Sequence, residues 1–109
     1  MGTFSQLGGE QAVMEMINEF VPRDKIQMVH FRDVQGTLSD FKECFLGDGR
    51  YDPAKIMFAL NKCGYKGLIL DDHVPFINND TRWGHTARSN AFGYLRGMKK
   101  MMEYLSENK

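Results

Sequence analysis

Two short segments of the chain place histidine and aspartate directly after an apolar run. His30, Arg32 and Asp33 stand at the end of residues 26–34 (IQMVHFRDV), and Asp72 and His73 follow residues 67–70 (GLIL). Neutral histidine is a common metal ligand, and arginine binds carboxylates with a planar fork of donors. The pattern predicts one shared polar site. The alternative interpretation is a solvated strand end with an incidental salt bridge.

Both apolar runs have the length and composition of β-strands. Residues 26–34 carry Ile26, Met28, Val29 and Phe31 with little polar alternation, which is typical of a strand covered on both faces in a parallel sheet. Residues 66–70 predict the second strand. Because the carboxyl ends of parallel strands carry the chemistry of α/β folds, we expect the side chains of His30 and Asp72 to converge at one rim.

The remaining segments predict helices and one loop. Residues 1–9 are glycine-rich and predict an irregular loop, and residues 10–21 predict a helix that ends before Pro22. Its apolar face is expected to consist of Val13, Met16, Ile17 and Phe20. Residues 37–46 predict a short helix with Leu38, Phe41 and Phe45 on one side.

Two further helices are expected in the second half. Asp52 and Pro53 predict the start of one that Gly64 ends, with Ile56, Ala59, Leu60 and Cys63 on its buried face. The last is expected over residues 86–105, with an inner face of Ala91, Tyr94, Leu95, Met98, Met102 and Leu105. Strands that alternate with helices favour parallel β/α units.

Composition excludes several classes of function. The net charge is zero over 109 residues, so we expect neither a nucleic-acid partner nor attraction to anionic membranes. No apolar run approaches the roughly 20 residues that span a bilayer, and no secretory signal is expected at the start. Cys44 and Cys63 form no metal-binding pair, and we interpret them as reduced thiols in a cytoplasmic protein.

Several motifs in this order resemble the carboxyl-terminal part of D-mannonate dehydratase. They are HFRDVQGT, FKECFLGDGRYD and CGYKGLILDDHVP, followed by a helix similar to the family pattern ARxxAxGYxxG. The resemblance covers nearly the whole chain and implies a TIM (β/α)8 barrel, which takes about 250 residues. The expected fold class is therefore α/β, a partial barrel, with residues 1–109 as its carboxyl-terminal segment containing the last two parallel strands and their helices.

The resemblance also implies a reaction and a cofactor. The family removes water from D-mannonate to give 2-keto-3-deoxy-D-gluconate in hexuronate (glucuronate) catabolism, using Mn²⁺ or Fe²⁺ held by histidine, cysteine and aspartate. By this resemblance His30 and Asp72 are metal ligands. The equivalents of the other ligands, a histidine and a cysteine, are expected to precede Met1, so we expect the chain alone to be inactive.

The resemblance implies further roles for charged residues. Arg32 is expected to act in catalysis and in binding the substrate carboxylate or a developing enolate. His73 is expected to be an acid/base group or the partner of a metal ligand, with a structural histidine at the barrel rim as the alternative. His85 and Arg88 are expected to bind substrate, with a solvated helix start as the alternative.

Three carboxylates beside these residues receive other interpretations. Glu43 matches the family's F-x-E motif and is expected to orient a ligand or its loop. Asp33 and Asp71 are interpreted as structural.

Two other functions stay open from the sequence. One is a non-catalytic α/β module that self-associates and so buries the open edges of its sheet. The other is a fragment of a metal-dependent sugar isomerase on a similar barrel. The pairing of HFR with DHVP favours the dehydratase, and a homo-oligomer is expected in either case.

Overall fold

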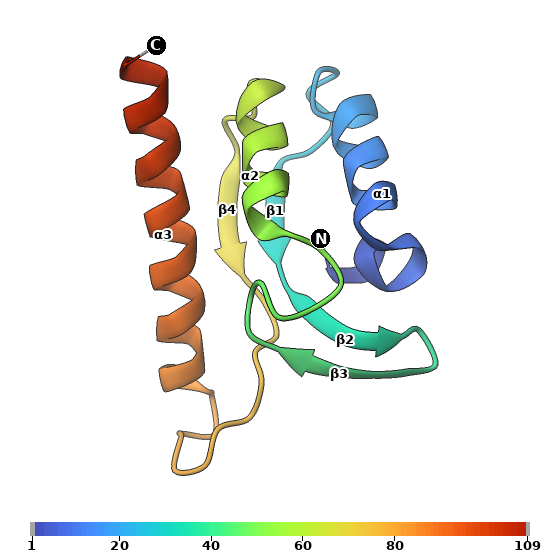
Figure 1. The fold of residues 1–109 in the computed structure, drawn as a ribbon, viewed down its shortest axis with the longest axis vertical. Helices are drawn as coiled ribbons and strands as arrows, with labels where there is room; N and C mark the ends of the chain where they lie inside the picture. The colour runs from blue at the N-terminus through green and yellow to red at the C-terminus, as the bar shows by residue number, and fades with distance from the viewer. Residues whose placement is uncertain (1, 109) are drawn as a thin grey trace.

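The computed structural model describes residues 2–108 and contains two small sheets packed among three helices (Figure 1). β1 (Met28–Phe31) and β4 (Leu68–Asp71) are parallel neighbours, and their register pairs His30 with Leu70 and Phe31 with Asp71. β2 (Asp33–Thr37) and β3 (Asp40–Cys44) form an antiparallel pair. The predicted α/β class and parallel strand pair are confirmed. Closure into an eight-stranded barrel stays a prediction.

The core lies on one face of the parallel pair. Val29 and Phe31 of β1 are buried there, together with residues from α1 (Gly2–Phe20), α2 (Pro53–Lys62) and α3 (His85–Glu107). Met28 and its partner Leu68 are 48% and 66% exposed. The prediction that the first strand is covered on both faces is therefore wrong for the described residues, because only one face of the pair meets helices.

Local capping residues define α2 as predicted. The Asp52 side chain accepts a hydrogen bond of 2.9 Å from the backbone N–H of Ala54. Pro53 occupies the first helical position, where its missing N–H removes no helical hydrogen bond. Gly64 follows the helix at φ 78°, a left-handed conformation that glycine adopts without strain. Ile56, Ala59 and Leu60 are buried as predicted, and Cys63 packs half-buried against the core.

The helix predicted for residues 37–46 is wrong, because this segment forms the turn and second strand of the β2–β3 hairpin. Its apolar residues recur at helical spacing, yet Leu38 and Phe41 are both exposed. Gly36 has φ 98°, and a Cβ added there would lie 2.2 Å from the Asp40 carbonyl oxygen. A residue without a Cβ thus allows the two strands to approach at this point.

The irregular loop predicted for residues 1–9 is wrong over residues 2–8, which are helical; Met1 lies outside the described residues. Gly9 interrupts α1 with φ 67° and ψ −160°, so the helix is kinked immediately before the predicted start. The end at Phe20, two residues before Pro22, agrees with the prediction. Val13 and Ile17 are fully buried and Met16 packs against the core, whereas Phe20 is exposed, contrary to the prediction.

The long carboxyl-terminal helix is confirmed. Ala91 and Leu95 are buried, and Met98 and Met102 pack against the core. Tyr94 and Leu105 are exposed, so the predicted inner face is wrong at these two positions. Among the described residues, no helix combines the length and the apolar character needed to span a bilayer.

Candidate functional site

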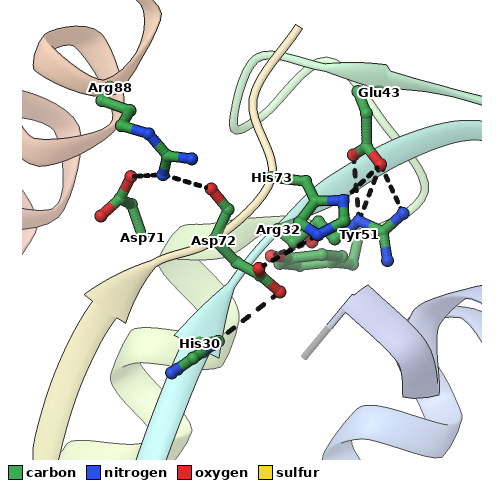
Figure 2. A network of polar contacts seen from close by, with 8 residues as sticks. All are labelled: His30, Arg32, Glu43, Tyr51, Asp71, Asp72, His73 and Arg88. Carbon is green, nitrogen blue, oxygen red and sulfur yellow. Dashed lines mark hydrogen bonds and ion pairs between the residues drawn. The ribbon is translucent and has the colours of Figure 1, made fainter. Parts of the chain in front are cut away.

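Polar side chains gather where β1 and β4 end, at the edge from which the β2–β3 hairpin and the loop to α3 leave the sheet (Figures 1 and 2). The parallel register pairs His30 of β1 with Leu70 of β4, and Asp72 directly follows the last residue of β4. Their closest atoms, His30 Nδ1 and Asp72 Oδ2, are 3.9 Å apart. The predicted convergence of the two side chains is confirmed.

Asp72 connects two histidines through its two oxygens. Its Oδ2 faces His30, while its Oδ1 lies 3.7 Å from Nε2 of His73. The other ring nitrogen of His73, Nδ1, lies 3.4 Å from Glu43 Oε1. Figure 2 shows the imidazole of His73 between the two carboxylates. A carboxylate oxygen therefore faces each ring nitrogen of this largely exposed imidazole.

The donor set at this edge fits part of a metal site. Histidine nitrogen and carboxylate oxygen bind first-row divalent metals at about 2.0–2.2 Å, so two such ligands of one ion are at most about 4.4 Å apart. The 3.9 Å between His30 Nδ1 and Asp72 Oδ2 meets this limit. Within residues 2–108 no group of three His, Cys, Asp or Glu side chains is arranged to hold a metal. His30 and Asp72 are thus close enough to contribute two ligands to one ion, and their role as metal ligands stays a prediction.

Glu43 of β3 binds Arg32, which lies between β1 and β2. The Arg32 Nε–H donates to both carboxylate oxygens, at 2.9 and 3.0 Å, and Nη2 donates to Oε1 as well. The Arg32 guanidinium also lies 5.4 Å from the centre of the Phe41 ring. The hydrogen bonds to Glu43 raise the pKa of Arg32, so the residue stays charged. Glu43 thus positions an arginine whose Nη1 group makes no hydrogen bond within the described part of the chain.

A buried carboxylate holds the backbone next to Arg32. Asp33 has no exposed surface, and its Oδ1 and Oδ2 accept four backbone N–H bonds of 3.0 Å, from Val34, Gly47, Gly49 and Arg50. Burial raises the pKa of Asp33, while the four donors act in the opposite direction. The structural role predicted for Asp33 is confirmed: it ties the loop after β3 to the start of β2.

Tyr51 holds the same segment from the core side. Its hydroxyl donates a hydrogen bond of 2.9 Å to the carbonyl oxygen of Arg32, and burial raises its pKa. Sequence reasoning missed this residue, although it lies within the motif FKECFLGDGRYD that carries the resemblance. Its neighbour Asp52, which caps α2, belongs to the same segment.

Arg88 and His85 lie at the start of α3 and differ in their contacts. Nη1 of Arg88 donates at 2.8 Å to both the Asp71 carboxylate and the Asp72 carbonyl oxygen, so it fixes the backbone of a predicted ligand (Figure 2). The structural role of Asp71 is confirmed by this ion pair. His85 contacts Thr81 instead, with 2.8 Å between Nδ1 and the hydroxyl oxygen. The structure does not bring His85 into the cluster around Asp72.

Neither cysteine joins the cluster, and both thiols are free. Burial and nearby carboxylates raise the pKa of Cys44 to about 12. A thiol binds a metal as its thiolate, so Cys44 is a poor ligand near neutral pH.

A cavity of about 230 Å³ adjoins the cluster and was not expected from the sequence. It lies between Glu43 and the loop that connects β4 to α3, and its wall includes His73, Arg82 and Trp83. No motif indicated it, since loop conformation decides which of these side chains meet.

Comparisons with known proteins agree with the resemblance. A family model described as D-mannonate dehydratase (UxuA) matches residues 1–109. The mannonate dehydratase of Lactococcus lactis subsp. lactis (strain IL1403) is 33% identical over 99 residues, which cover 84% of this chain and 28% of the relative. That of Lactococcus lactis subsp. cremoris (strain MG1363) is 32% identical over 99 residues with the same coverage. The chain thus spans little more than a quarter of the length of these relatives.

Proposed function

The chain belongs to the D-mannonate dehydratase family, and from this membership we propose that it is the carboxyl-terminal part of a metal-dependent lyase. The proposed reaction removes water from D-mannonate to give 2-keto-3-deoxy-D-gluconate, in cytoplasmic hexuronate catabolism. In this proposal residues 1–109 form the end of a (β/α)8 barrel, and β1 and β4 are two adjacent barrel strands. One observation carries the proposal: the two oxygens of Asp72 face His30 on one side and His73 on the other.

The reaction presents two chemical difficulties. The proton on the carbon next to the carboxylate is weakly acidic, and hydroxide is a poor leaving group. His30 and Asp72 would hold Mn²⁺ or Fe²⁺, which supplies Lewis acidity toward substrate oxygens when bound. His73, which lies between Asp72 and Glu43, would take up or return a proton.

Two arginines support this arrangement. Arg32, held through Nε and Nη2 by Glu43, would offer Nη1 to a substrate oxygen on which negative charge develops. Arg88 would hold the backbone of Asp72 in place through its bond to that carbonyl oxygen. Its contribution to substrate binding is thus indirect in this proposal, through the position of Asp72.

An exchange experiment tests the proposed function. The segment of the Lactococcus lactis subsp. lactis enzyme that matches this chain is replaced by the chain itself, and formation of the 2-keto-3-deoxy acid from D-mannonate is followed with Mn²⁺ present. We expect turnover by the chimera and none by the isolated chain, because two ligands hold a metal weakly and positioning requires the opposing groups.

A second experiment distinguishes a misfolded chimera from an inactive site. The remainder of the Lactococcus enzyme is co-expressed with this chain as a separate polypeptide. Folded chimera and folded complex that both lack turnover, while the parent enzyme is active, contradict the proposed function. Turnover by the isolated chain that His30→Ala and Asp72→Ala each abolish would instead show that self-assembly completes the site.

We also propose that the isolated chain forms homo-oligomers through the open face and edges of the parallel pair. Met28 and Leu68 are partners across the pair, and both are largely exposed. Unpaired strand edges and exposed apolar side chains favour association. This observation also favours the second candidate function, a self-associating module without catalysis.

Sedimentation velocity checks the association. The chain is expected to form dimers or larger species at micromolar concentration, and Leu68→Lys is expected to shift it toward monomer. Leu38→Lys, which changes another exposed leucine in the hairpin turn, serves as the matched control. A compact monomer at all concentrations would rule out the proposed association.

A further inference from the structure

The wall of the cavity beside His73 includes one arginine whose side chain has no hydrogen bond or ion pair among the described residues. Arg82, Trp83 and Phe76 of the loop between β4 and α3 line this space of about 230 Å³, and Glu43 and His73 form its boundary with the cluster around Asp72. Because His73 belongs to both the cavity and the cluster, a molecule bound in the cavity lies next to the proposed acid/base group.

The other charged groups in the cavity wall are already engaged. Glu43 binds Arg32, and Asp80 accepts three backbone N–H bonds, from Thr81, Thr86 and Ala87. Arg88 donates to Asp71, to the carbonyl oxygen of Asp72 and to that of Trp83. These bonds leave the three groups with less capacity to bind a ligand.

Arg82 differs from these groups. No hydrogen bond or ion pair joins its side chain to any of residues 2–108. Its guanidinium therefore has all five donors available, in the planar arrangement that binds a carboxylate through two parallel hydrogen bonds.

We propose that Arg82 binds the carboxylate of the substrate in this cavity and so selects a sugar acid over a neutral sugar. The assignment rests on the proposed function for the identity of the substrate. The carbon that loses its proton is bonded to the carboxyl carbon, so a carboxylate on Arg82 brings that carbon next to His73. The leaving hydroxyl group then lies toward the side of the cluster that carries Asp72 and His30.

Trp83 provides the measurement, because it is the single tryptophan of the chain and lines the same cavity. The isolated chain is titrated with sodium D-mannonate, and in parallel with D-mannitol in matched sodium chloride. We expect D-mannonate to change the tryptophan emission saturably and D-mannitol to leave it unchanged. Arg82→Gln is expected to weaken binding about 10-fold or more, the usual effect of losing a charged hydrogen-bond partner.

Arg96→Gln is the matched control, since it removes an exposed arginine of α3 that does not line the cavity. This variant is expected to bind D-mannonate as the unaltered chain does. Equal responses to D-mannonate and D-mannitol, or an unchanged affinity in Arg82→Gln, would overturn the assignment. Circular dichroism of each variant shows whether it retains the fold.

The chimera separates this inference from the proposed function. In an active chimera, Arg82→Gln is expected to raise KM for D-mannonate about 10-fold or more, with a smaller change in kcat. If the chimera is active and Arg82→Gln leaves its KM for D-mannonate unchanged, the role of Arg82 is overturned. The proposed function is then unaffected. If the folded chimera and the folded complex both lack turnover while D-mannonate binding depends on Arg82, the proposed function is overturned and a sugar-acid site is supported.

Discussion

Replacing Asp72 by alanine in the active chimera is expected to lower kcat/KM for D-mannonate more than about 100-fold. Even partners that only orient a metal ligand commonly change metal affinity or activity about 10- to 100-fold, so loss of a ligand has a larger effect. Asp72 faces both His30 and His73, and its removal affects metal binding and the position of the proton-transfer group together. His30→Ala is expected to weaken metal binding while leaving the contact between His73 and Asp72.

Metal content and kinetics measured on the same samples check this prediction. Both variants are expected to retain substoichiometric Mn²⁺, and excess metal is expected to rescue His30→Ala better than Asp72→Ala. Asp40→Ala, which removes an exposed carboxylate in the hairpin, is the control and is expected to retain the activity of the chimera. Full metal content and more than a tenth of the original kcat in Asp72→Ala would contradict the assigned role.

Asp33→Asn is expected to lower the free energy of unfolding of the chain by about 2–6 kcal/mol. Each oxygen of Asp33 accepts two backbone N–H bonds, and an amide NH2 in place of one oxygen would face two donors. Two buried N–H groups would lose their acceptor, at a cost of about 1–3 kcal/mol each. Because small domains are stable by only about 5–15 kcal/mol, the variant is expected to be largely unfolded at modest urea concentrations.

Urea unfolding followed by far-ultraviolet circular dichroism measures the change. Asp40→Asn makes the same chemical substitution at an exposed position and is expected to leave the midpoint unchanged. An Asp33→Asn midpoint equal to that of the unaltered chain would show that the introduced amide finds another set of partners. The loop would then not depend on a carboxylate.

Local sequence was sufficient to predict those helices and strands whose ends are set by residues close by in the chain. Asp52, Pro53 and Gly64 bound α2 through contacts within a few residues, so the helix was predictable from the sequence alone. The two apolar runs likewise predicted a parallel pair. Since the carboxyl ends of parallel strands lie at one edge, the proximity of His30 and Asp72 followed from the order of strands and motifs.

The hairpin was not predictable from the same local signals. Leu38, Phe41 and Phe45 have a spacing that suits one face of a helix. In a segment this short, contacts with other parts of the chain decide between helix and strand. Here the partners are distant in sequence: Arg32 binds Glu43, and Asp33 binds the loop at residues 47–50. Long-range contacts with buried charges therefore overrode the local helical pattern.

The sequence by itself determined the family, the parallel pair and the polar edge on which His30, Asp72 and His73 meet. Only the tertiary structure decided which charges remain available there. Arg32 and Arg88 were both expected to bind substrate, with a solvated helix start as the alternative for Arg88. In the structure Glu43 binds Nε and Nη2 of Arg32 and Asp71 binds Arg88, whereas Arg82 lines the cavity without a partner among the described residues. The physical reason is that an arginine's availability depends on carboxylates brought to it by folding, and residue type and spacing do not specify those distances.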